Sequence, residues 1–517
     1  MSTTGPPLDV LVVGAGPTGL ALAAQVHAHG GSVRIVDRNA DRVHESRALA
    51  VQPRTLEVLT SLDLAATLVE RGNPAVQLRL HAEGRDVSLP LFDLGMSDTD
   101  YPFLLFVSQA VTEQVLVEHL AGRGVAVERE VTLVGCEDTG EQVRCELRDR
   151  DGGVEEVSAR YLAGCDGARS TVRELAGIRF AGDPYPQVFA LADLEVDGLE
   201  PDLVHAYLTA GGPLFFFPLG EPASWRMITM RSPGDVDGDA TLDDLRMAVR
   251  AVAGDRLRLR DPVWLADFRL QRRQAARYRA GRLFLAGDAA HVHSPAGAQG
   301  MNTGIQDAWN LGWKLALVAR GVADPALLET YHTERAPVGR TVVRFTDRAF
   351  RVATSAGPLI RLVRTRLVPR LLPLLGQLPR LRAAAFRIIA ELSIDYRGSA
   401  GVQEGRPAPR SGPRAGDRLP SGQFIVDGDR RSLHEARAGP GFRLLLCGPP
   451  DRWPAGQVEE LAHRYAGLLS VRKAERLGGP ANSHFLVRPD GHVGYRAGGT
   501  DLAGLGDYLR RWLPGAG

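Results

Sequence analysis

The sequence predicts an α/β protein of two or three domains, and three observations carry this prediction. The chain has 517 residues, whereas a typical domain takes roughly 100–200. A strand–helix–strand pattern stands at the N-terminus, and strand and helix patterns return over residues 282–320. A strand-rich stretch lies between these two segments, and a small α/β stretch follows them.

The N-terminal pattern starts with residues 9–13 (DVLVV), which are short, apolar and β-branched and so predict a buried strand. The sequence Gly14-Ala-Gly-Pro-Thr-Gly19 follows at once. Residues 18–29 carry apolar side chains at helical spacing, and residues 32–36 (SVRIV) predict a second strand that leads to Asp37. The segment is therefore a β–α–β unit with a glycine-rich turn after its first strand.

Each glycine of that turn has its own task. Gly14 allows the tight turn, Gly16 lets the backbone approach a pyrophosphate, and Gly19 lets helix and strand pack closely. Free N–H groups at the start of the helix bind phosphate oxygens. Asp37 is placed to accept a hydrogen bond from a ribose hydroxyl. A glycine-rich turn without a ligand is the alternative, but strand, helix and acid together favour a bound dinucleotide.

Two later segments place an acid beside a glycine at the end of a predicted strand. The first is Cys165-Asp166-Gly167, after a strand over 154–162, and an ordinary turn before a helix explains it at least as well. The second is Gly287-Asp288, where Asp288 projects from the tip of a buried strand. A glycine-dense run over 294–304 and a helix over about 305–320 follow. The N-terminus of that helix is expected to face an electron-rich group.

The remaining segments divide by periodicity and composition. Helices are predicted within about 45–60, 107–120 and 340–392, and strands near 125–134, 143–148 and across 185–232. Residues 401–422 are rich in proline, glycine and arginine and predict a linker. Residues 423–517 predict a small α/β unit, with strands near 442–447 and 484–488 and a helix from about 500 to 513.

With these three motifs in this order, the chain resembles the para-hydroxybenzoate hydroxylase-like group of FAD-dependent monooxygenases, and within it the aromatic polyketide hydroxylases of actinomycetes. The resemblance covers roughly residues 9–400. It implies a Rossmann-like FAD-binding domain with an inserted β-sheet substrate domain, a helical connector and a C-terminal thioredoxin-like domain. The corresponding ranges are 1–182 and 266–400 for the FAD-binding domain, 340–400 for the connector within it, 183–265 for the substrate domain, 401–422 for the linker and 423–517 for the C-terminal domain. That last domain is expected to be inert in redox, because its one cysteine, Cys447, has no partner for a dithiol.

The resemblance also implies which residues hold FAD. Those at the pyrophosphate are Gly14, Gly16, Pro17, Thr18 and Gly19, and those at the adenosine half are Asp37 and Arg38. Other parts of the cofactor would be contacted by Arg47, Gln109, Leu133 and Asp166, its ribitol chain by Asp288, and the pyrimidine edge of its flavin by Gly300, Met301 and Asn302. Pro295 would lie near the reactive edge of the flavin, where the resemblance assigns no side-chain acid or base.

Candidate substrate residues come from the strand-rich stretch. In Phe215-Phe216-Phe217-Pro218, strand alternation sends Phe215 and Phe217 to one face and Phe216 to the other. An aromatic pocket lined by Phe215, Phe217, Pro218, Tyr207 and Trp225 is one explanation, and a plain sheet core is another. Arg226 is a further candidate of the same kind. His291 and His293 flank the predicted flavin loop, where satisfying local backbone groups is the first explanation and proton transfer the second.

The implied function is an FAD-dependent monooxygenase that consumes NADPH or NADH and hydroxylates an aromatic polyketide or other phenolic substrate with O2. In such enzymes the oxygen passes from a flavin C4a-hydroperoxide to the ring. The motifs describe the cofactor rather than the substrate. They leave open a Baeyer–Villiger or epoxidising oxygenase acting on a polyketide ketone or quinone, a flavin reductase of the same fold, and a non-catalytic FAD- or ligand-binding protein. The sequence has no second dinucleotide fingerprint, so NADPH or NADH is expected to bind transiently over the FAD domain.

Charge and cysteine content limit the kinds of partner and the cellular location that we expect for the protein. The net charge of +1 gives no overall field for a nucleic acid. The four cysteines lack the spacing of a zinc site, and scattered thiols are typical of a reducing cytoplasm. Neither a secretory signal nor an apolar run of about 18 residues is present, so we expect a cytoplasmic protein without stable membrane insertion. A monomer and a homodimer are equally compatible with the sequence.

Overall fold

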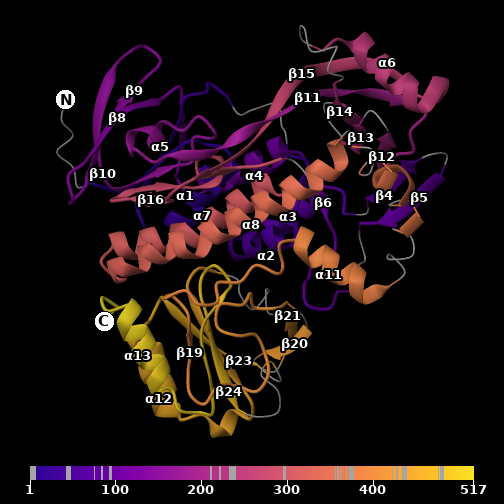
Figure 1. The fold of residues 1–517 in the computed structure, drawn as a ribbon. Helices are drawn as coiled ribbons and strands as arrows, with labels where there is room; N and C mark the ends of the chain where they lie inside the picture. Colours follow the sequence, from indigo (N-terminus) through magenta and orange to yellow (C-terminus); the bar gives the residue numbers. More distant parts are fainter. Residues whose placement is uncertain are drawn as a thin grey trace.

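The computed structural model shows three large β-sheets with helices packed between and around them (Figure 1). The residues that it describes are 7–41, 48–74, 76–82, 85–91, 96–209, 212–219, 223–231, 240–294, 298–355, 357, 360, 362–367, 370–371, 378–421, 423–426, 429–432, 439–474, 477 and 482–516.

The first sheet grows from the N-terminal unit. Its strands follow the order β16–β17–β10–β1–β2–β7, and from β17 to β7 each neighbouring pair runs parallel. They are β1 (Leu8–Val13), β2 (Val33–Asp37), β7 (Val127–Arg129), β10 (Val154–Gly164), β16 (Arg279–Ala280) and β17 (Leu283–Leu285). Strand β9 (Val143–Arg148) pairs antiparallel with β10, and β8 (Thr132–Asp138) pairs antiparallel with β9. Because the central strands are parallel, β1, β2, β10 and β17 end at one edge.

Two helices pack against each other beside this sheet, and both confirm predicted helices. They are α1 (Pro17–Ala28) and α7 (Gly300–Ala319). Helix α7 is buried along its whole length from Met301 to Ala319. Polar groups buried in this way need partners inside the protein. Helix α7 begins about five residues before its predicted start near 305, because its glycines allow close packing rather than ending the helix.

The other helices and the short strands of this region complete the layer around the first sheet. They are β3 (Ala50–Val51), α2 (Pro53–Leu59), α3 (Ala65–Arg71), β6 (Leu105–Phe106), α4 (Gln109–Ala121), α5 (Thr171–Leu175), α8 (Glu329–Thr354) and α11 (Pro379–Ile389). Helix α4 packs on α1, and α8 packs on α7. Among the helices described, none combines the length and the apolar content that a membrane crossing needs.

The second sheet has the order β18–β15–β11–β14–β13–β12–β4–β5. Its strands are β4 (Gln77–Ala82), β5 (Arg85–Pro90), β11 (Phe180–Asp197), β12 (Leu203–Thr209), β13 (Gly212–Pro218), β14 (Trp225–Met230), β15 (Arg258–Ala275) and β18 (His291–Val292). Helix α6 (Leu242–Ala253) covers one face, at the outer end of the molecule (Figure 1). The sheet is larger than the predicted range 183–265, because β4 pairs with β12 from far away in the sequence.

The C-terminal unit is a third sheet with the order β19–β25–β24–β22–β23–β20–β21, shown in orange to yellow in Figure 1. The predicted elements are confirmed as β22 (Phe442–Cys447), β24 (Ser483–Val487) and α13 (Ala503–Trp512). The rest are β19 (Gln403–Glu404), β20 (Gln423–Val426), β21 (Asp429–Ser432), α12 (Ala455–Arg464), β23 (Leu469–Ala474) and β25 (Val493–Gly498).

Within residues 401–422, which composition predicts to be a linker, parts of the described range 401–421 pack against other segments of the chain. Strand β19 pairs with β25, and Leu419 is buried. Arg418 is also buried, and its guanidinium donates to Glu57 at 2.7 Å and to Asp98 at 2.8 Å. The proline and glycine content predicted a linker, but composition does not reveal that an arginine within it will pair with acids from distant parts of the sequence.

Candidate active site

Three sequence motifs meet at the carboxyl edge of the first sheet. Gly14–Gly19 follows β1, Asp166 follows β10, and Gly287-Asp288 follows β17. A Cβ placed on Gly14 would lie 2.8 Å from Cα of Asp166, and one on Gly287 would lie 2.5 Å from Oγ1 of Thr18. The backbones of the three motifs are therefore in contact, although they come from distant parts of the chain.

The glycine-rich loop has the geometry that its sequence predicts. Gly14 has a φ of 102°, in the region that favours glycine, and a Cβ on Gly19 would overlap the carbonyl of Gly14. Gly16 differs, because a Cβ there would meet no atom of the described residues within 4 Å, apart from its chain neighbours and the backbone of its own helix. Gly16 is the N-cap of α1, and no side chain caps this helix. The loop thus leaves open space, beside unused N–H donors, where the sequence predicts a pyrophosphate.

Asp37, at the end of β2, is buried and holds this loop. Its carboxylate accepts the N–H of Ala15 at 2.6 Å and that of Asn39 at 2.8 Å. A carboxylate has about four lone-pair positions, so positions remain for ribose hydroxyls. Arg38 is exposed next to it. The structure therefore gives Asp37 a role in the loop that is compatible with its predicted role toward adenosine.

Asp166 supports the start of helix α5, and Arg173 of this helix joins the second motif to the third. Its carboxylate accepts the hydroxyl of Ser170 at 2.5 Å and the N–H of Val172 at 3.2 Å, and burial raises the pKa of Asp166 despite these hydrogen bonds. Arg173 donates to the carbonyl of Ala289 at 3.0 Å, in the turn of the third motif. Asp166 thus has a structural task in its own turn, and its contact with FAD stays a prediction.

The Gly287–Asp288 turn presents a carboxylate at the sheet edge. Gly287 has a φ of 60°, and its N–H donates to the buried carboxylate of Asp307 at 3.1 Å. A Cβ on Gly304 of α7 would overlap the hydroxyl of Thr18. The turn, α1 and α7 therefore pack around Thr18, and Asp288 is exposed beside them.

Helix α7 begins at the same edge. Asn302 accepts the N–H of Gln52 at 2.8 Å and donates to the carbonyls of Ala50 at 2.9 Å and Ala298 at 2.8 Å. Gly300 is half-buried and Met301 is buried. The side chain of Asn302 is thus occupied by protein contacts. The uncapped N-terminus of this 20-residue helix is the part that is available to a ligand.

Four other residues are predicted to contact the cofactor. Gln109 begins α4, and its side chain donates to Glu113 at 2.8 Å. Leu133 is buried in β8 opposite Leu147. Arg47 and Pro295 lie outside the described residues. The cofactor contacts of all four stay predictions.

The second sheet separates the predicted substrate residues onto two faces. Phe216 is fully buried on the face that α6 covers, and Trp225 and Tyr207 pack with it there. Pro218 pairs with Trp225 at the end of β13. Phe215 and Phe217 lie on the opposite face, with ring centroids 5.7 Å apart. The predicted alternation is present, but the five candidates do not line one pocket.

The face that carries Phe215 and Phe217, called the inner face below, leads to the cofactor edge. Phe217 packs with Phe106 of β6, and Phe106 pairs with Ala50 of β3. The carbonyl of Ala50 accepts the amide of Asn302 at the start of α7. A molecule held on the inner face would therefore lie between the sheet and the motifs that are expected to bind FAD.

A buried ion pair on the inner face was missed by sequence reasoning. Arg226 donates to both oxygens of Asp193 at 2.6 Å, and Arg226 stands opposite Phe217 in the sheet. Among the described residues, none is a hydrogen-bond partner for the buried Nη1 atom of Arg226. A buried donor of this kind calls for a partner, which a bound molecule could supply. The two residues are 33 positions apart, so no local pattern pairs them.

The two histidines near the flavin loop are held by the protein. The Nε2 atom of His291 lies 2.7 Å from Asp307, and a ring nitrogen of His293 lies 2.8 Å from the carbonyl of Ser294. Burial lowers the pKa of His293 to about 4, so this ring is neutral at ordinary pH. Within the part of the chain that the structure describes, no cluster of His, Cys, Asp and Glu is arranged to hold a metal.

This edge of the sheet fits FAD. The space above Gly16 and the donors of α1 suit a pyrophosphate. The buried Asp37 and the exposed Asp288 offer carboxylates on either side of it, at the ends of β2 and β17. The N-terminus of α7 offers positive dipole potential for an electron-rich ring system.

Comparisons with known protein families match nearly the whole chain. Residues 7–346 match the family described as "FAD binding domain", and residues 412–516 match "Aromatic-ring hydroxylase, C-terminal". The first match contains all three motifs of the sheet edge. The second contains most of the C-terminal sheet.

Individual relatives agree with these families. The chain is 37% identical to 6-methylpretetramide 4-monooxygenase of Streptomyces rimosus, over 96% of this chain and 92% of that protein. It is 34% identical to rifampicin monooxygenase of Streptomyces venezuelae, over 98% of this chain and 99% of that protein. Its fold is similar to the solved structure of OxyS anhydrotetracycline hydroxylase from Streptomyces rimosus, with a TM-score of 0.78, 30% identity and coverage of 98% and 99% of the two chains.

Proposed function

We propose that this chain, which belongs to the FAD-dependent aromatic-ring hydroxylases, hydroxylates a phenolic polyketide with electrons from NADPH or NADH. Three motifs meet at the carboxyl edge of the first sheet, beside a sheet face that carries two aromatic rings and the buried Nη1 donor of Arg226, and this arrangement supports the proposal. The relatives are named for oxygenation of 6-methylpretetramide, rifampicin and anhydrotetracycline, which favours a substrate of the polyketide kind.

The chain's own residues would bind the cofactor in three places. Asp37 and Arg38 would hold the adenosine half, the N-terminus of α1 the pyrophosphate, and Asp288 the ribitol chain. The N-terminus of α7 would face the flavin and favour negative charge on it. FAD, when bound, supplies the redox chemistry that activates O2 and delivers one oxygen atom to the substrate.

The inner face of the second sheet would orient the substrate. Phe215 and Phe217 would stack against an aromatic ring, since aromatic pairs gain energy beyond their buried area. The free Nη1–H of Arg226 would donate to a phenol or carbonyl oxygen of that ring. A donor of this kind rejects substrates that lack the oxygen, because the buried N–H would then stay unpaired.

The experiment is to supply the FAD-loaded protein with NADPH or NADH and a panel of phenolic polyketides, and to follow reductant oxidation, O2 uptake and product mass. We expect substrate to accelerate reductant oxidation and to yield a product heavier by one oxygen atom. Reductant oxidation without any oxygenated product would indicate a flavin reductase. No redox turnover with any member of the panel would favour a binding protein.

A further inference from the structure

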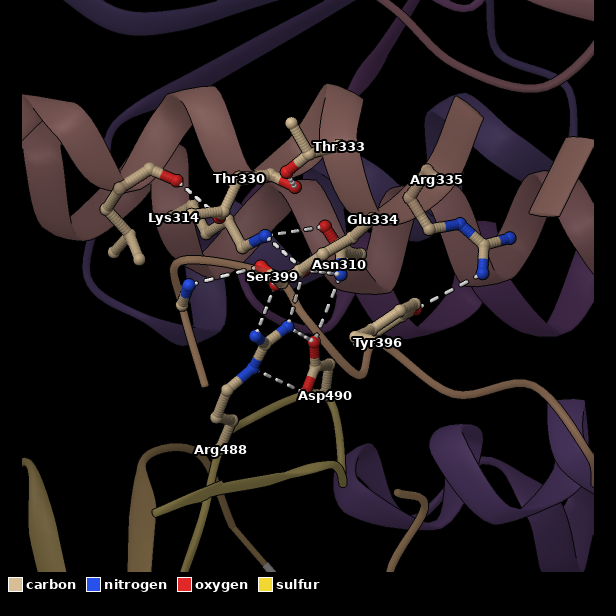
Figure 2. Close-up of polar contacts among 12 residues, drawn as sticks. Asn310, Lys314, Thr330, Thr333, Glu334, Arg335, Tyr396, Ser399, Arg488 and Asp490 are labelled. Carbon is tan, nitrogen blue, oxygen red and sulfur yellow. Dashed lines mark hydrogen bonds and ion pairs between the residues drawn. The ribbon is translucent and has the colours of Figure 1, made fainter. Parts of the chain in front are cut away.

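A buried polar cluster joins the C-terminal unit to helix α7 (Figure 2). It contains three cationic and three anionic side chains, each at most 2% exposed, namely Lys314, Arg335, Arg488, Asp307, Glu334 and Asp490. The charges balance within the cluster. Charges buried to this extent must be paired, because leaving one of them alone is costly.

Helix α7 contributes one polar stripe to this cluster. Asp307, Asn310 and Lys314 follow helical spacing and so lie on the same side of the helix. Lys314 donates to Asn310 at 2.8 Å and to Glu334 of α8 at 2.7 Å. At the other end of the stripe, Asp307 accepts Nε of Arg335 at 2.6 Å and the N–H of Gly287 at 3.1 Å. The stripe therefore connects α8 with the turn that presents Asp288.

The C-terminal unit supplies the other half of the cluster. Arg488 follows β24 and donates to both oxygens of Glu334, at 2.6 and 2.8 Å. It also donates to both oxygens of Asp490, and Asp490 accepts Asn310 of α7 at 3.2 Å. The guanidinium of Arg488 lies 5.3 Å from the ring centroid of Tyr396, whose hydroxyl accepts Arg335 at 3.2 Å. Figure 2 shows these groups converging between α7, α8 and the C-terminal loop.

We propose that the C-terminal unit is a positioning part of the flavin site, in which Arg488 and Asp490 fix α7 against α8 and Asp307 passes this placement to the Gly287–Asp288 turn. The inference rests on the proposed placement of FAD at that turn. Without Arg488, Glu334 and Asp490 would be left as two buried carboxylates facing the single charge of Lys314. Their repulsion would shift α7 relative to α8 and loosen Asp307 from Gly287.

The test uses the full-length protein loaded with FAD and measures FAD release on dilution, together with the visible spectrum of the bound flavin. In Arg488→Met we expect release to be about 2- to 30-fold faster and the spectrum to change, which is the range of coupling that mutations within such networks produce. The double variant Arg488→Met/Asp490→Asn removes one charge of each sign, so its release should be slower than that of Arg488→Met. Arg488→Lys keeps the charge but loses the paired donations to Glu334 and Asp490, so its FAD release should be faster than that of the wild type and slower than that of Arg488→Met. If the methionine variant does not fold, wild-type release in Arg488→Lys would overturn the proposal.

A matched control is available in the same sheet. Arg496 is also buried and pairs with Glu404 at 2.7 Å, but this pair lies within the C-terminal part of the chain. Arg496→Met should lower the thermal unfolding midpoint while leaving FAD release and the flavin spectrum unchanged. Wild-type release in a folded Arg488→Met protein, or equal acceleration in Arg496→Met, would overturn the proposal. FAD release is measured without substrate, so a failure to hydroxylate would count against the proposed function and leave this result standing.

Discussion

The carboxylate of Asp307 accepts the backbone N–H of Gly287 at 3.1 Å, although the sequence presents the two residues in separate segments. The same carboxylate meets Arg335 and His291, so a single buried acid fixes a turn, a helix and a histidine ring. The shape of the sheet edge where FAD is expected to bind therefore depends on the buried contacts of Asp307 as well as on the glycines of the edge itself.

Gly16→Val should abolish FAD retention. The valine side chain would fill the space above the start of α1, where no protein atom lies within 4 Å of the Cβ position, and would displace the pyrophosphate. The measurement is the FAD-to-protein ratio after purification. Gly456→Val is the matched control, because Gly456 in α12 also has nothing within 4 Å of its Cβ position and lies in the C-terminal unit. A fully loaded Gly16→Val protein would show that the pyrophosphate lies elsewhere.

Asp288→Ala should weaken FAD binding by about 1.5–3 kcal/mol, or roughly 10- to 150-fold in Kd, because it removes a charge-assisted hydrogen bond. Fluorescence titration of the apoprotein with FAD measures the change. Asp255→Ala removes an exposed carboxylate from the outer end of the second sheet and should leave the Kd unaltered. Equal affinities for wild type and Asp288→Ala would mean that Gly287-Asp288 is a turn and nothing more.

Cys447→Ser should leave kcat nearly unchanged. Cys447 ends β22, in which every residue is buried, and a buried thiol behaves as a small apolar group. Placing a hydroxyl there should cost stability by about 1–3 kcal/mol if the hydroxyl finds no partner. Turnover is compared at equal FAD content, which confirms folding. A large fall in kcat with normal FAD content would point to a function of the thiol.

Glu391 should make the stability of the protein depend on pH. Its buried carboxyl accepts the hydroxyl of Thr303 at 2.7 Å and an amide of Gln306, and burial raises its pKa from 4.5 to about 7. The folded state therefore holds a proton that the unfolded state releases. The stabilising contribution is complete below about pH 4.5 and is lost as the pH rises to about 7, by the order of 3 kcal/mol.

The measurement compares thermal unfolding midpoints of wild type and Glu391→Gln at about pH 5 and about pH 8. Glutamine cannot ionise, so the wild type should lose more stability than the variant between these two values. The same pH dependence in both proteins would show that Glu391 titrates as an ordinary carboxyl.

The sequence predicted those parts of the site whose signal lies within one short segment of the chain. Gly14, Gly16, Gly19 and Asp37 could be assigned because the spacing of strand, turn, helix and acid is itself the signal, and the structure gives them that geometry. Strand alternation, which places Phe215 and Phe217 on one face of the sheet, could also be predicted from the local sequence. The start of α7 could not be predicted locally, because Gly300 and Gly304 suggest a loop. Only the structure shows that Gly304 lies inside the helix and packs against Thr18.

The parts that the sequence did not predict depend on contacts between distant residues. Arg226 on β14 pairs with Asp193 on the neighbouring strand β11. Arg488 pairs with Glu334, which lies 154 positions away in the sequence. Neither arginine differs in its local sequence from the many exposed arginines of this chain. The burial of Arg418 in the predicted linker was missed for the same reason. Its guanidinium is paired by Glu57 and Asp98, which lie far away in the sequence.

The measurement that tests the central claim most directly is product mass under 18-O2. The FAD-loaded protein is supplied with NADPH or NADH and a phenolic polyketide that it converts, in water of ordinary isotopic composition. We expect one 18-O atom in each product molecule, bonded to the aromatic ring. A product whose new oxygen comes from water, or reductant consumption with no labelled product from any member of the panel, would contradict it.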